Sequence, residues 1–180
     1  MLESNNPKFN HLKIHTQYSI CEGAIKIDNL KDFCKENKIP CLGLSDTSNL
    51  CGALEFAENI SKVGTQPIIG TQINFRFEDT TGLLPLIALN EKGYKRIIEL
   101  SSRSYLENDA LSDPHLDIKE LLTDTDGVLL LSGTIQGLFG KLFQKGRLEE
   151  ISKIYKDLSL KLYDNFYLEI QRHGDQNEIA

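Results

Sequence analysis

A few side chains that could bind a metal ion or transfer a proton occur just after short apolar runs of the sequence. A metal centre that activates water for hydrolysis needs several imidazole or carboxylate groups that converge on one point. The sequence offers only a thin set of such groups. Those whose placement suits a shared polar cluster are His15, Glu22, Asp46 and His173.

Each of these residues also has an ordinary structural interpretation. His15 could hydrogen-bond the backbone at the end of a strand, and Glu22 before Gly23 is common turn chemistry. Asp46 lies in the polar stretch 45–49, where its carboxylate could accept backbone N–H groups of a turn or cap a helix. The spacing of these residues leaves both the structural and the metal-binding interpretation open.

Other catalytic motifs are not found. Gly133, Gly137 and Gly140 indicate a turn after residues 128–131. They are too loosely spaced for a dinucleotide-binding loop, and no Lys-Ser/Thr pair follows them as in a P-loop. The sequence contains no nucleophile elbow and no set of carboxylates for two Mg²⁺ ions.

The elements that must position these residues alternate between strand-like and helix-like patterns. We expect strands at residues 11–15, 41–44, 67–69, 73–77, 83–88, 128–131 and 166–170, with a hairpin through the polar turn 78–82. We expect helices at residues 28–37 (capped by Asp28), 52–63, 90–105 (capped by Asn90) and 148–163, and a short one opened by Asp117. This alternation predicts an α/β fold with a mainly parallel sheet and functional groups at the carboxyl ends of its strands.

Periodicity also predicts which helix residues are buried. The helix at 28–37 should bury Leu30, Phe33 and Cys34. The helix at 52–63 should bury Leu54, Phe56, Ala57 and Ile60, and the helix at 90–105 should bury Tyr94, Ile97, Ile98 and Ser101.

Composition limits the possible functions. The 180 residues include 26 acidic and 20 basic side chains, which gives a formal net charge of −6. A domain that binds DNA phosphates by itself is usually basic, so DNA binding by these residues alone is not expected. No signal peptide or membrane span is predicted. Cys21, Cys34, Cys41 and Cys51 form no CxxC pair, and we expect reduced, mostly buried thiols in a cytoplasmic protein.

Six blocks of the sequence, in the same order, resemble the amino-terminal PHP (polymerase and histidinol phosphatase) domain of bacterial DNA polymerase III alpha subunits. The set is more specific than any single block and spans the whole chain. The blocks are residues 11–24 (HLKIHTQYSICEGA), 43–56 (GLSDTSNLCGALEF), 66–72 (QPIIGTQ), 88–94 (ALNEKGY), 131–133 (LSG) and 166–174 (FYLEIQRHG).

This resemblance implies a distorted (β/α)7 barrel with helices outside. Residues 1–180 would form a PHP domain that stops before its last strands, with polymerase domains beyond it. The parent protein would be a DNA-directed DNA polymerase, a nucleotidyltransferase of DNA replication whose polymerase domains use Mg²⁺. Its implied partners are the proofreading exonuclease subunit, the other holoenzyme subunits and DNA, without a membrane.

The sequence departs from the family at the positions of its metal ligands. Of seven positions that we can align, only His15 and Glu22 keep ligand chemistry. Neutral oxygens bind transition metals weakly, and a lysine would bring positive charge into a cation site. The seven vestigial positions are Lys13, His15, Glu22, Thr47, Gln72, Leu83 and Thr134.

Two functions compete on this basis. The first is a metal-free structural module that docks the exonuclease subunit, with no catalytic residue and no cofactor in this segment. The alternative is an active metal-dependent 3′–5′ exonuclease or phosphoesterase of the PHP family. The number of remaining ligands favours the first.

Overall fold

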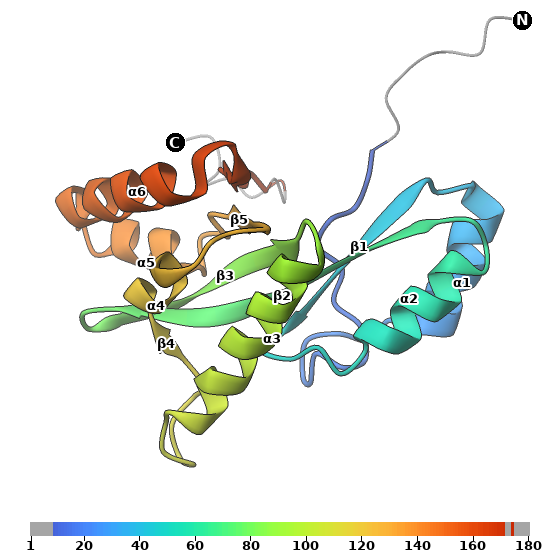
Figure 1. The fold of residues 1–180 in the computed structure, drawn as a ribbon, viewed down its shortest axis with the longest axis horizontal. Helices are drawn as coiled ribbons and strands as arrows, with labels where there is room; N and C mark the ends of the chain where they lie inside the picture. The colour runs from blue at the N-terminus through green and yellow to red at the C-terminus, as the bar shows by residue number, and fades with distance from the viewer. Residues whose placement is uncertain (1–8, 172–173, 175–180) are drawn as a thin grey trace, which may run out of the picture.

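The structure, a computed structural model, describes residues 9–171 and 174. Its helices flank a six-stranded sheet (Figure 1). The strands are β1 (Cys41–Thr47), β2 (Gln66–Phe77), β3 (Thr80–Ala88), β4 (Leu116–Asp117), β5 (Val128–Leu131) and β6 (Phe166–Tyr167). The helices are α1 (Ile27–Asn37), α2 (Ala53–Ser61), α3 (Glu91–Leu106), α4 (Ile118–Thr123), α5 (Leu138–Gln144) and α6 (Leu148–Leu162), followed by the 3-10 turn η1 (Tyr163–Asn165).

The sheet is mixed and open. Its strand order is β1-β2-β3-β5-β6, and β4 pairs with β2 off this path. The pairs β1–β2, β2–β4 and β5–β6 are parallel, whereas β3 runs antiparallel to both β2 and β5. Within the described residues β1 and β6 do not pair, so the sheet does not close. This arrangement confirms the predicted α/β fold and fits an incomplete distorted barrel.

The β2–β3 hairpin is the longest pairing of the sheet. Phe77 pairs with Thr80, so the turn is shorter than the predicted stretch 78–82. The two predicted strands at 67–69 and 73–77 are in fact one strand. Gly70 permits this continuity, because a Cβ atom there would lie 2.4 Å from the carbonyl oxygen of Leu86.

The buried apolar side chains form two cores. The large core lies around β2, β3 and β5 and is covered by α3 to α6, with Phe75 and Leu86 among its fully buried members. The small core joins β1 to α1 and α2 through residues such as Leu44 and Phe56. Leu50 packs against both cores. In Figure 1, α1 and α2 accordingly lie beside β1, while α5 and α6 lie at the other end of the sheet.

The predicted helix starts are confirmed in two of three cases. Asn90 accepts a hydrogen bond from the Gly93 N–H at 3.0 Å, and Asp117 accepts one from the Lys119 N–H at 2.9 Å. Asp28 is not a cap: the α1 N-cap is Lys26, and Asp28 lies in the first turn. A carboxylate in that turn still interacts favourably with the helix dipole.

Three expected core residues are exposed. Phe33, Leu54 and Ile98 have 45%, 72% and 40% of their surface accessible. On α2, Phe56 and Ile60 are buried as predicted, but Ala53 rather than Leu54 is the third buried residue.

Three elements differ from the predicted ones. Residues 11–15 make only an isolated parallel bridge, from Ile14 to Leu44, rather than a strand. The strand at 166–170 is reduced to the two residues of β6. The glycines after β5 were predicted to form a turn, but Gly137 is the N-cap of α5 and Gly140 packs inside that helix against the backbone of Ile135.

The four cysteines are free, which agrees with the prediction of thiols, but the expected burial holds only in part. Cys34 is buried and Cys41 is half-buried, whereas Cys21 and Cys51 are exposed. Among the described residues, no helix has the length and apolar character that a membrane span requires.

Candidate functional site

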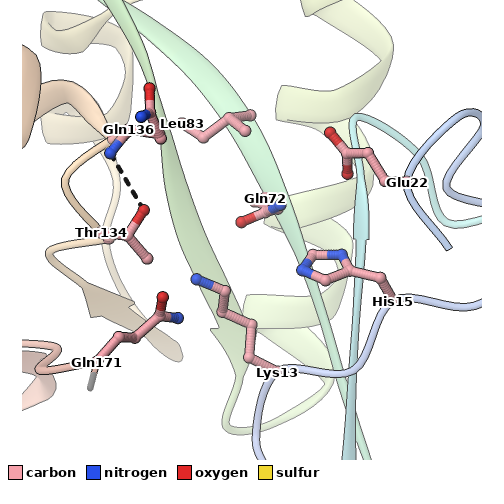
Figure 2. A pocket seen from close by; sticks show the side chains of 10 residues that line it. Lys13, His15, Glu22, Gln72, Leu83, Thr134, Gln136 and Gln171 are labelled. Carbon is pink, nitrogen blue, oxygen red and sulfur yellow. Dashed lines mark hydrogen bonds between the residues drawn. The ribbon is translucent and has the colours of Figure 1, made fainter. Parts of the chain in front are cut away.

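A cavity of about 410 Å³ lies on one side of the sheet, and most of the vestigial positions line it. Figure 2 shows these side chains pointing into a common space. Six of the seven positions take part: Lys13, His15, Glu22, Gln72, Leu83 and Thr134. The remaining lining residues are Gly133, Gln136, Gly137 and Gln171.

Several strands deliver these residues to the cavity. Gln72 lies within β2 and Leu83 within β3, because both strands of the hairpin continue past the cavity. Thr134 follows β5, and Gln171 follows β6. The expected location at strand ends therefore holds for β5 and β6, but not for the hairpin.

Thr47, the seventh position, lies at the end of β1 and connects two lining residues. Its hydroxyl donates to the Glu22 carboxylate, and it accepts a hydrogen bond from Gln72 Nε2 at 2.9 Å. Glu22 reaches this position because the loop folds back on itself at Gly23. A Cβ atom there would lie 2.0 Å from the carbonyl oxygen of Thr16, so the close approach requires glycine.

Asp46 does not take part in the predicted polar cluster. It is fully buried and does not line the cavity. Its carboxylate accepts hydrogen bonds from the Thr16 backbone N–H at 2.6 Å, the Thr16 hydroxyl at 2.8 Å and the Ser19 hydroxyl at 2.7 Å. Asp46 therefore fixes the loop that carries His15 and Glu22. This structural role differs from the two expected ones, because its donors belong to Thr16 and Ser19 and the N-cap of α2 is Gly52.

Lys13 is paired with a residue that sequence reasoning did not select. Its Nζ lies 2.8 Å from Glu169 Oε1, and their side chains are 16% and 12% exposed. Gln171 Nε2 donates to the same oxygen at 2.6 Å. Glu169 lies in the block 166–174, but no pattern in the sequence indicated that it meets Lys13, which is 156 residues away.

The environment of His15 favours a neutral imidazole. Burial lowers its pKa from the usual value of 6.5, and Lys13 lowers it further, whereas Glu22 raises it. Its Nδ1 atom is buried and has no hydrogen-bond partner among the described residues.

The residues at the cavity do not fit a metal cluster. Leu83 offers no ligand atom, Lys13 brings an ammonium group, and the Asp46 carboxylate is occupied by hydrogen bonds from Thr16 and Ser19. Among the described residues, no three His, Cys, Asp or Glu side chains lie close enough together to hold a metal ion. His173, the fourth member of the predicted cluster, lies outside the described residues.

Comparison with known protein families shows which family this chain belongs to. Residues 11–173 match the family described as "PHP domain". The chain belongs to the PHP domain family. This PHP domain is 36% identical over 189 residues to the DNA polymerase III subunit alpha of Caulobacter vibrioides, and 32% identical over 177 residues to that of Vibrio cholerae. It spans 16% and 15% of the lengths of these relatives.

The fold of the PHP domain is also found in solved structures. A putative metal-dependent phosphoesterase from Bifidobacterium adolescentis matches it with a TM-score of 0.60 at 13% sequence identity. The match covers 94% of this chain and 79% of that one. At this level of identity the similarity concerns the fold alone.

Proposed function

We propose that this PHP domain is the amino-terminal segment of a replicative DNA-directed DNA polymerase, and that it acts there as a metal-free structural and docking module. The parent chain would be a cytoplasmic nucleotidyltransferase of DNA replication that binds DNA and the other holoenzyme subunits. Its polymerase chemistry and Mg²⁺ would belong to other domains. The relatives support this parentage, because similarity to DNA polymerase III alpha subunits extends over the whole chain.

The lining of the cavity supports the metal-free state. A hydrolytic centre must lower the pKa of a bound water to about 7, which requires charged or imidazole ligands around the ion. Here Lys13 takes part in an ion pair and Thr47 in a hydrogen-bonded chain, so both act as partners of carboxylates. His15 and Glu22 are the ligand-type residues that remain.

Metal content and hydrolysis test this proposal. After dialysis, the protein should contain much less than one equivalent of Zn²⁺ or Mn²⁺ by mass spectrometry. With either ion added, it should not hydrolyse a single-stranded oligonucleotide or a phosphomonoester. One or more tightly bound ions, with turnover abolished by His15→Ala, would instead establish the alternative, an active exonuclease or phosphoesterase.

The docking role needs its own test. We expect the protein to bind a purified proofreading exonuclease subunit in titration calorimetry, with the same affinity in the presence and absence of EDTA. Binding that disappears with EDTA would contradict a metal-free module, and no binding at micromolar concentrations would contradict docking by this domain.

A further inference from the structure

The ion pair of Lys13 and Glu169 connects the two ends of the open sheet. The strands β1 and β6 are at opposite ends of the strand order. Lys13 precedes Ile14, which bridges to Leu44 of β1, and Glu169 lies just after β6. A contact between these two side chains therefore spans the side of the sheet on which no strand pairing occurs within the described residues.

Both ends of this contact are anchored by the backbone. The Ile14 N–H donates to the carbonyl oxygen of Gly43 at 3.1 Å, which holds the Lys13 segment against β1. The Glu169 N–H donates to the Ser132 hydroxyl at 2.9 Å, which holds the segment after β6 against the end of β5. The pair thus joins two segments that are each fixed to a different strand.

Two replacements at former ligand positions supply partners to carboxylates. Thr47 donates to Glu22, and Lys13 donates to Glu169. A carboxylate that is largely withdrawn from water needs either a cation or hydrogen-bond donors, and the loss of one partner of such a pair is strongly destabilising. Glu169 is such a carboxylate, since its side chain is only 12% exposed, and Lys13 supplies its cation. Glu22 is exposed to solvent, so its bond with Thr47 contributes less.

We infer that the Lys13 ammonium is the resident cation of the cavity, and that its pair with Glu169 is a strap that holds the two edges of the open sheet together. A metal cluster links strand ends through its several ligands, and here one ion pair makes a link between the first and last strands. This inference deepens the metal-free module proposed above and rests on it.

Hydrogen exchange and thermal unfolding of the intact chain test the strap. In Lys13→Met, the amide of Glu169 should exchange at least about tenfold faster, because its segment is released locally. The Tm should fall by roughly 5 °C or more, as expected for the loss of one member of a largely buried pair. The matched control Lys153→Met, at an exposed position on α6, should change neither value.

Two further variants keep the test decisive. Glu169→Gln preserves side-chain volume and should accelerate exchange of the same amide even if Lys13→Met does not fold. The double variant Lys13→Met, Glu169→Gln should lose less stability than the sum of the single variants, because no unpaired charge remains.

The strap would be overturned if the Glu169 amide exchanged at the wild-type rate in either single variant. It would also be overturned if the double variant lost as much stability as the two single variants together. A stoichiometric metal ion in the wild-type protein would instead contradict the proposed function, so the two failures are distinguishable.

Discussion

At the scale of single residues, the buried carboxylate of Asp46 organises the site without entering it. It accepts three hydrogen bonds from Thr16 and Ser19, and the Ser19 hydroxyl accepts one from the Thr47 N–H at 3.0 Å. This chain of bonds joins the loop before Glu22 to the end of β1. Asp46, which the sequence offered as a possible metal ligand, therefore holds two segments of the backbone together.

Replacement of Asp46 should be costly. In Asp46→Asn, the amide NH₂ group would face donors in place of one carboxylate oxygen, and a charged acceptor would be lost. We expect the free energy of unfolding to fall by about 2–4 kcal/mol in urea denaturation. Asp32→Asn, at an exposed position on α1, is the matched control and should change it by less than about 0.5 kcal/mol. Equal effects of the two substitutions would contradict the role of Asp46.

His15 should titrate below the usual histidine value of 6.5, which NMR can measure directly. Because its pKa is lowered in the folded state, the unfolded chain binds the proton more tightly. The contribution of His15 to stability is therefore lost as the pH falls from about 6.5 towards the folded-state pKa. Glu22 raises this pKa, so Glu22→Gln should lower it further. A higher pKa in Glu22→Gln would show that Glu22 does not act on His15.

The sequence indicated part of this site. Resemblance selected seven positions, and six of them line one cavity. It could not indicate Glu169, because contact between residues 13 and 169 depends on how the sheet curves. Nor could it tell that Asp46 points away, since strand alternation does not determine which polar residue finds buried donors.

At the scale of elements, helices with strong local signals were predictable. The start of α3 is an example: Asn90 supplies an oxygen to the Gly93 N–H, as capping residues do. The helix α5 was missed because its glycines suggested a turn. Gly140 is accepted there because a Cβ atom would lie 2.3 Å from the carbonyl oxygen of Ile135, so close packing outweighs helix propensity.

Loss of the α3 cap should have a moderate effect. We expect Asn90→Ala to lower the free energy of unfolding by about 1 kcal/mol, because the Gly93 N–H loses its acceptor. Lys95→Ala is a suitable control, since its exposed side chain pairs with Glu91 on the same helix. That change should cost less than about 0.5 kcal/mol. Similar urea midpoints for both variants would argue against the cap.

At the scale of the whole molecule, the two cores should unfold together. They are joined by the β1–β2 pairing and by Leu50. Cys34 reports on the small core, where burial also raises the pKa of its thiol and so lowers its reactivity.

Labelling of Cys34 by a maleimide should have the same urea midpoint as far-UV circular dichroism. Exposed Cys21 and Cys51 should react without urea and serve as internal controls. Labelling of Cys34 at a clearly lower urea concentration would show that the small core opens by itself.

The turn between β2 and β3 determines which residue of β3 lines the cavity. Leu83 precedes Leu84 and Leu86, which are buried in the large core, and neighbouring residues of a strand face opposite sides. The two-residue turn before β3 sets this alternation. One residue inserted there would shift the register and bring Gly82 or Leu84 to the place of Leu83. The chemistry of the cavity wall is therefore encoded partly in the length of a turn that does not touch it.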